Sequence, residues 1–188
     1  MIVSIAALIT SFVSIVLAVQ NSDSMNRLVQ ANSWPYLQLM SSNVADDGAR
    51  SISVQVRNTG IGPLRIETFV VTANGRDVGD VVELVKACCL VEETEIITAD
   101  DFAVKVGGIL TNNPTGMVLG PGDEVTVFAL PRQDAVDAVW RALDKARFKN
   151  SYRACYCSVF DECWTSDFKS SARTPVKSCK PEAESWSG

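Results

Sequence analysis

Residues 51–57, SISVQVR, alternate strictly between apolar and polar side chains, and this alternation decides the fold class. Ile52, Val54 and Val56 fall on one face of an extended chain, and the polar residues between them fall on the other. A pattern of period two predicts a β-strand with one face in a core and the other toward solvent.

Turn signals on the C-terminal side of this strand indicate that it belongs to an antiparallel sheet. Residues 58–63, Asn-Thr-Gly-Ile-Gly-Pro, form a tight connection and not a phosphate loop, because the P-loop Lys-Ser/Thr is missing and no helical pattern follows. Asn74-Gly75 predicts a β-hairpin. We expect the other strands at residues 34–40, 66–73 and 124–130, and in a hairpin over 150–168 that turns near residue 160.

Two stretches have the 3.6-residue spacing of short helices. Their apolar stripes are Val81, Leu84, Val85 and Cys88 in the first, and Val136, Val139, Trp140 and Leu143, preceded by Asp134 as a possible cap, in the second. Strands and helices do not alternate as in βαβ units. The soluble part is therefore predicted to be mainly β, an antiparallel β-sandwich over residues 34–168 with two helical insertions. The Ser-, Pro- and Lys-rich residues 169–188 are expected to be a loosely ordered tail.

The first 19 residues, MIVSIAALITSFVSIVLAV, carry no charge. At 1.5 Å per residue a helix of this length spans about 28 Å, close to the hydrocarbon thickness of a bilayer. We expect a transmembrane helix over residues 1–20 and a juxtamembrane helix or stalk over 21–33. A cleaved signal peptide is the less favoured alternative, since no basic residue precedes the run and the run is long.

Small residues recur along one face of this segment at alternating spacings of three and four. Small side chains allow close helix–helix approach in lipid, so the stripe is a candidate packing seam, although Ser and Ala are also common in membrane helices generally. The seam residues are Ser4, Ala7, Ser11, Ser14 and Ala18.

Composition excludes several functions. The net charge is −5 with no basic cluster, which argues against nucleic-acid binding. There is no histidine, so Ser-His-Asp and Cys-His catalysis and His-ligated metals are excluded. We therefore expect no catalytic residue, no metal and no cofactor.

Six cysteines are the disulfide candidates: Cys88, Cys89, Cys155, Cys157, Cys163 and Cys179. Cys157 and Cys163 are equidistant from residue 160, which favours a bond across the hairpin. Cys88 or Cys89 could pair with Cys155 or Cys179. A vicinal Cys88–Cys89 bond is disfavoured by the predicted helix, and a thiolate metal site is the rival interpretation.

The cysteines favour an extracytoplasmic domain in the bacterial inner membrane, because disulfides persist in oxidising compartments. Arg27, the one basic residue near the segment, favours the alternative of a cytoplasmic domain.

With the 58–63 turn and the strand entry Leu-Gly-Pro-Gly-Asp-Glu-Val at 119–125, the chain resembles bacterial membrane-anchored Ig-like proteins of unknown function. The resemblance covers most of residues 1–165. It implies an Ig-like sandwich behind an N-terminal helix, and it implies no activity.

These patterns predict a membrane-tethered, non-enzymatic interaction or assembly module, an accessory subunit of a membrane complex. Its partner would be another protein or a second copy, bound through the helix and the sandwich. A possible contact surface is formed by Tyr156, Phe160 and Trp164. The alternative is a membrane-anchored enzyme with an unrecognised Asp/Glu or Ser/Lys site, for which Asp161-Glu162 is the one suggestive acidic pair.

Overall fold

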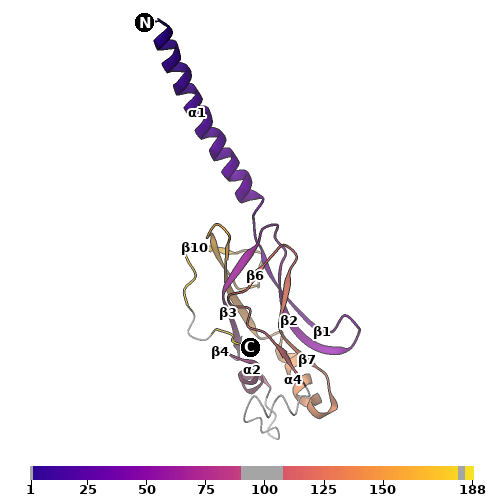
Figure 1. The fold of residues 1–188 in the computed structure, drawn as a ribbon. Helices are drawn as coiled ribbons and strands as arrows, with labels where there is room; N and C mark the ends of the chain where they lie inside the picture. The colour runs from indigo at the N-terminus through magenta and orange to yellow at the C-terminus, as the bar shows by residue number, and fades with distance from the viewer. Residues whose placement is uncertain (1, 90–107, 182–184) are drawn as a thin grey trace.

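The computed structural model describes residues 2–89, 108–181 and 185–188, except for the side chains of residues 2–9 and 135. It shows a mixed α and β chain in which one long helix precedes two antiparallel sheets in a sandwich-like arrangement (Figure 1). The expectation of a mainly β chain is corrected in this respect, because helix continues well past the apolar segment.

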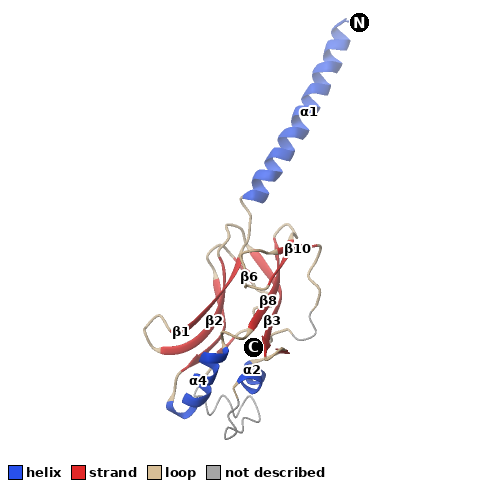
Figure 2. Ribbon diagram, turned by 180° about the vertical axis from the view of Figure 1, so that it is seen from behind, coloured by secondary structure: helices blue, strands red, loops and turns tan. Residues whose placement is uncertain are grey.

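Helix α1 (Ile2–Ala31) projects from one end of the sheets (Figures 1 and 2). Its second half carries polar residues and continues to Ala31. The predicted juxtamembrane segment is therefore helical almost to the first strand. No helix with described side chains is both long and apolar enough to cross a membrane. The predicted transmembrane segment over 1–20 is therefore confirmed as helical from residue 2, but not as a membrane span.

The first sheet has the order β1-β2-β7-β5. Its strands are β1 (Leu37–Val44), β2 (Arg50–Asn58), β7 (Glu124–Pro131) and β5 (Leu110–Thr111). Strand β2 contains the alternating stretch, and Ile52, Val54 and Val56 are fully buried, as the pattern predicts. Strand β1 begins later than expected, because Trp34 and Pro35 form the connection from α1.

The second sheet has the order β10-β9-β8-β3-β4, with β6 also paired to β3. Its strands are β10 (Thr174–Val176), β9 (Cys163–Ser166), β8 (Ser151–Ser158), β3 (Leu64–Ala73), β4 (Arg76–Val78) and β6 (Val118–Leu119). The hairpin signal at Asn74-Gly75 is confirmed: both residues have positive φ angles, 49° and 77°, and they join β3 to β4. The predicted 150–168 hairpin is β8 and β9.

Two helical segments lie at the end of the sheets that is farther from α1 (Figure 2). Helix α2 (Val81–Cys88) is capped by Asp80, whose carboxylate accepts from the Glu83 N–H at 2.8 Å. A 3-10 turn, η1 (Asp134–Val136), precedes helix α4 (Asp137–Ala146). Asp134 was expected to cap this helix, but it lies in the 3-10 turn and does not. The apolar stripes of both helices pack into the core formed between the sheets.

The described residues of the C-terminal tail, 169–181 and 185–188, contact the rest of the domain, unlike the loosely ordered tail expected over 169–188. Strand β10 extends the second sheet by pairing with β9. Trp186 is fully buried; its backbone N–H donates to the Phe69 carbonyl at 2.8 Å and its indole N–H to the Asn112 carbonyl at 3.1 Å. Composition alone missed this segment because its contacts with the domain, among them the Trp186 bonds and the Cys155–Cys179 pair, join residues that are far apart in the sequence.

Candidate functional site

Four of the six cysteines gather on the outer face of the second sheet. Cys155 and Cys157 are two residues apart on β8, so they share a face, while Tyr156 between them points into the core. The antiparallel register places Cys163 of β9 directly opposite Cys157. Cys179 reaches the same place from the tail. We call Cys155, Cys157, Cys163 and Cys179 the sulfur cluster.

The sulfurs of this cluster form two pairs at disulfide distance. Cys157 and Cys163 have an S–S distance of 2.07 Å, the pair that the symmetry of the hairpin predicts. Cys155 and Cys179 are at 1.95 Å, which ties the tail to β8. The two pairs also touch, because the Sγ atoms of Cys157 and Cys179 are 3.7 Å apart.

The remaining two cysteines pair with each other and not with the cluster. Cys88 and Cys89 have an S–S distance of 1.88 Å. The sequence argument against this vicinal pair assumed that both residues are helical. Helix α2 ends at Cys88, however, and Cys89 has a φ angle of −139°, outside the helical range, so the backbone restriction does not apply.

A thiolate metal site is the alternative use of these sulfurs. The Sγ atoms of Cys157, Cys163 and Cys179 all lie within 4.8 Å of one another, and such a set could hold a soft metal ion. In the structure each of these sulfurs is within bonding distance of another, and a sulfur in a disulfide has no thiolate to offer.

Solvent reaches the sulfur cluster through a pocket of about 300 Å³. Its rim carries charge of both signs: the guanidinium of Arg65 bonds the carboxylate of Glu67 and lies 3.5 Å from that of Asp161. The pocket is lined by Arg65, Glu67, Cys157, Asp161, Cys163, Lys177, Ser178 and Cys179. Cys179 is the only partly exposed sulfur of the four, since the other three cysteines are buried.

The proposed acidic pair lies at the rim of this pocket, in the β8–β9 turn. Asp161 has a positive φ angle of 58° and its side chain is 84 % exposed. Glu162 is exposed as well. Such carboxylates are surrounded by water, which is not the environment that tunes a general acid or base.

The predicted aromatic contact surface is only partly a surface. Tyr156 is fully buried, with its ring 6.0 Å from that of Trp164, and burial raises the pKa of its phenol. Trp164 is half-buried, and Phe160 is 47 % exposed at the turn. Tyr156 is therefore a core residue and drops out of the surface, because residues alternate faces along β8 and it lies opposite the cysteines.

Arg173, which sequence reasoning missed, connects the tail to the start of the domain. Its guanidinium lies over the rings of Trp34 and Trp164, 4.5 and 4.2 Å from their centroids, and donates to the Pro35 carbonyl. Two aromatic rings around one guanidinium are a favourable cation–π arrangement. Tyr36 adds a bond from its hydroxyl to the Ser171 carbonyl at 3.2 Å. Residues 169–176 thus form a strap across the base of α1.

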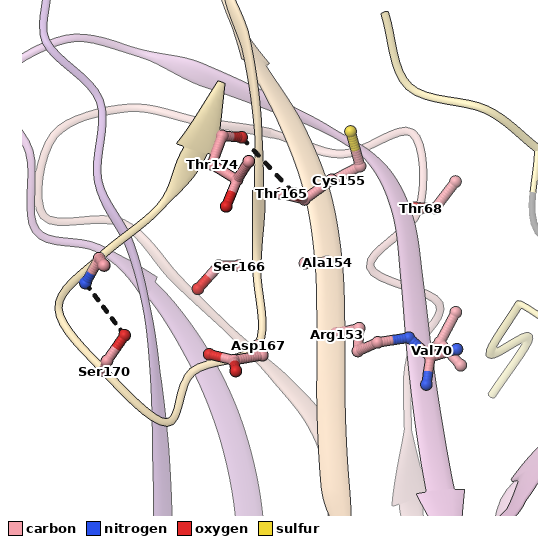
Figure 3. A pocket seen from close by; sticks show the side chains of 11 residues that line it. Thr68, Val70, Arg153, Ala154, Cys155, Thr165, Ser166, Asp167, Ser170 and Thr174 are labelled. Carbon is pink, nitrogen blue, oxygen red and sulfur yellow. Dashed lines mark hydrogen bonds between the residues drawn. The ribbon is translucent and has the colours of Figure 1, made fainter. Parts of the chain in front are cut away.

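A second pocket, of about 290 Å³, lies between the outer face of β3 and β8 and this strap (Figure 3). Hydroxyl and carboxylate side chains from the strap side face it, among them Ser166, Asp167 and Thr174. Arg153 lines the other side, but its guanidinium is engaged by Thr72 and Asp77. The Thr72 hydroxyl, and after it Arg153, hold the pKa of Asp77 below its usual range.

The seam residues lie on α1, which projects away from the two sheets (Figure 1). Residues 10–31 are exposed throughout, and the Ser14 hydroxyl donates back to the Thr10 carbonyl at 2.8 Å. The side chains of Ser4 and Ala7 lie outside the described part, so the seam is traced there by Ser11, Ser14 and Ala18.

Comparisons with family models, with curated proteins and with solved structures gave no match. The resemblance to membrane-anchored Ig-like proteins stays a prediction.

Proposed function

We propose that this chain is a non-enzymatic interaction module, held at a membrane by its N-terminal helix and acting as an accessory subunit of a membrane complex. Its disulfide-linked domain would lie on the extracytoplasmic side and follow the Ig-like pattern that the sequence resembles. The strap and the turn next to it, at the base of the helix, would form the surface presented to partners.

The observation that carries this proposal is the exposure of apolar side chains on α1. Phe12, Ile15 and Leu17 are 60–68 % exposed, although each would gain by burial. Because successive residues of a helix are about 100° apart, the apolar residues between 12 and 19 cover every face. A helix that is apolar all round is typical of burial in lipid or among other helices.

The arrangement of the domain supports a role in binding more than one in catalysis. The most elaborate contacts at its helix-proximal end are structural ones: a guanidinium between two indoles and two cysteine pairs. Aromatic side chains that remain partly exposed there, Trp34 and Phe160, are residue types enriched at protein interfaces.

Attachment is tested by washing cell membranes with alkaline carbonate and sequencing the N-terminus of the protein that remains. We expect the full chain in the pellet with residues 1–19 intact. A mature chain that begins near residue 20, or release into the supernatant, would overturn the membrane proposal.

The role as a subunit is tested by affinity purification of the full chain from detergent-solubilised membranes. Stoichiometric partners, or a homo-oligomer, are expected. As a matched control, Phe160→Ser and Trp34→Ser change the proposed surface, while Phe148→Ser changes an apolar side chain that is 77 % exposed elsewhere. Loss of partners with the first two variants and not with the third supports the surface. A monomer free of partners would contradict the proposal.

A further inference from the structure

We propose that the sulfur cluster is a thiol–disulfide exchange site. When a thiol reductant enters its pocket, the bond from Cys179 of the tail to Cys155 is replaced by a bond from Cys179 to Cys157. The inference deepens the proposed function and rests on it, because it requires that the cysteine pairs be oxidised in the mature protein. Its chemical partner is a dithiol reductant, small or at the tip of a protein.

The contact that carries the inference is the 3.7 Å between the Sγ atoms of Cys157 and Cys179, which belong to different pairs. Thiol–disulfide exchange needs a thiolate to reach one sulfur of a disulfide, and here the two sulfurs already touch. Cys179 therefore has two neighbours on the same face of β8: its partner Cys155 at 1.95 Å and Cys157 at 3.7 Å.

Accessibility determines where a reductant begins. Cys179 is partly exposed and lines the 300 Å³ pocket, whereas Cys155, Cys157 and Cys163 are buried. Arg65 and Lys177 line the same pocket together with Glu67 and Asp161, so the charge around Cys179 is mixed and exposure decides the site of attack. Attack on Cys179 is therefore the accessible first step.

A dithiol reduces the Cys155–Cys179 bond and is itself oxidised to a cyclic disulfide. Its two electrons and two protons are transferred to Cys155 and Cys179, which become thiols. The thiolate of Cys179 then attacks Cys157, forming a Cys157–Cys179 bond and expelling Cys163 as a thiolate, which takes up the proton that Cys179 lost. After one two-electron reduction, Cys155 and Cys163 are thiols and the tail is still covalently attached to β8.

The transfer has a structural consequence for the strap. Cys157 lies two residues from Cys155, so the anchor moves about 7 Å along β8. The move is toward the end of β8 where the β8–β9 turn lies, because β8 ends at Ser158. Partial reduction would then shift the strap that carries Arg173 over Trp34 without releasing it.

The first arm of the test uses the full-length wild-type chain in detergent. Without reductant, alkylation after acid quench should leave all four cysteines of the cluster unmodified. If all of them react, the four cysteines are not disulfide-bonded in the mature protein, and the proposed extracytoplasmic location of the domain is contradicted. If they are blocked, one equivalent of dithiothreitol followed by alkylation and peptide mapping should label Cys155 and Cys163 and recover a Cys157–Cys179 cross-link. Labels on Cys155 and Cys179 alone would overturn the exchange and leave the proposed function standing.

The second arm needs no reductant. In Cys163→Ser the Cys157 thiol is free to attack Cys179, so both Cys155–Cys179 and Cys157–Cys179 cross-links should be found, in amounts within about tenfold of each other. The control, Cys157→Ser with Cys163→Ser, should hold the Cys155–Cys179 bond alone. Complete alkylation of Cys157 in the single variant, or a Cys155–Cys157 cross-link, would overturn the exchange.

Discussion

The two ends of this chain use apolar side chains in opposite ways. The N-terminal helix is rich in them between residues 10 and 19 and covers none with its own domain. The last 20 residues contain few, yet they bury Trp186 completely between the two sheets, where its ring lies 5.8 Å from that of Phe128. One end presents apolar surface outward, and the other closes the core.

The difference shows that the count of apolar residues in a segment does not determine whether the segment is part of a core. Trp186 packs where β3 and β7 face each other, and neighbouring backbone bonds hold it there, including Ser187 N–H to the Gly79 carbonyl at 2.7 Å. The apolar burial of the described tail is concentrated in Trp186, whereas the apolar surface of α1 is spread over many side chains.

The largest expected effect is therefore on Trp186. Trp186→Ala should destabilise the domain by about 3–5 kcal/mol, because it removes a large side chain from a packed core and leaves a cavity. Denaturant unfolding followed by circular dichroism measures the change. Trp186→Phe is the control; it keeps an aromatic ring and should cost less. Equal stability of Trp186→Ala and wild type would mean that the tail does not contribute to the core.

The second effect compares the two cysteine pairs of the cluster, which close chain segments of different length. Cys155 and Cys179 are separated by 24 positions and Cys157 and Cys163 by 6. Because the longer closed loop restricts the unfolded chain more, the first pair should stabilise the fold by about 3–4 kcal/mol and the second by about 2 kcal/mol. Replacing both cysteines of a pair by serine leaves no unpaired thiol, and unfolding of the two double variants in oxidised form gives the comparison. The reverse order would show that the tail is held mainly by Trp186.

The fold follows from the sequence where one short pattern determines a backbone conformation. The alternation of residues 51–57 and the Asn74-Gly75 turn each have a local physical cause, and both were predicted correctly. Asn58 marks the limit of that reasoning. It was interpreted as part of a turn, but its buried amide donates to the carbonyls of Gly62 and Leu119 and accepts from the Gly60 N–H. The bond to Leu119 links residues 61 positions apart, and no local pattern signals it.

The candidate site was predictable to a smaller degree for the same reason. The pairing of Cys157 with Cys163 could be predicted from their equal distance from residue 160, because both lie in one hairpin. The position of Cys179 depends on the path of the whole tail, and Arg173 between Trp34 and Trp164 depends on three separate segments. Cys88 and Cys89 were misjudged because the predicted helix was extended past the residue where it ends.

The third expected effect is a small change in stability when the Asp77 carboxylate is removed. It tests how much charged contacts contribute, relative to apolar burial, at the edge of the sheet next to the tail. Asp77 accepts from Thr72 at 2.6 Å and from Arg153 at 2.9 Å, and its pKa is lowered, the Thr72 bond being the largest cause. A carboxyl with a lowered pKa in the fold stabilises above its unfolded pKa of about 3.9, and this contribution is lost as pH falls through the folded value. The wild-type protein should be slightly more stable than Asp77→Asn at neutral pH, and this difference in stability should disappear in acid.

That comparison is made by thermal unfolding of both proteins across a pH series, with Asp144→Asn as a control on another ion pair. Because Asp77 is a third exposed, solvent reduces the effect. A gap that widens as pH falls would have the wrong sign for a lowered pKa. A loss at neutral pH as large as that of Trp186→Ala would mean that charge matters as much as burial at this edge.

The smallest expected effect on the domain is at its other end, on α1. Ser11 and Ser14 replaced by Leu should leave the unfolding of the domain unchanged, because residues 10–31 are exposed and the helix projects away from the sheets (Figure 1). The same replacement should weaken association of α1 with a second copy or a partner helix, since bulky side chains keep two backbones apart in an apolar medium. Val13 and Val16 replaced by Leu are the matched control, because they add volume to α1 outside the seam. Cross-linking and size measurement in detergent give the oligomer size of each variant, and circular dichroism gives the melting temperature. If Ser11 and Ser14 behave like the valines, the stripe reflects composition only, and α1 contributes apolar surface without a preferred face. If the melting temperature falls as well, α1 is coupled to the domain, and the contrast between the two ends of the chain does not hold.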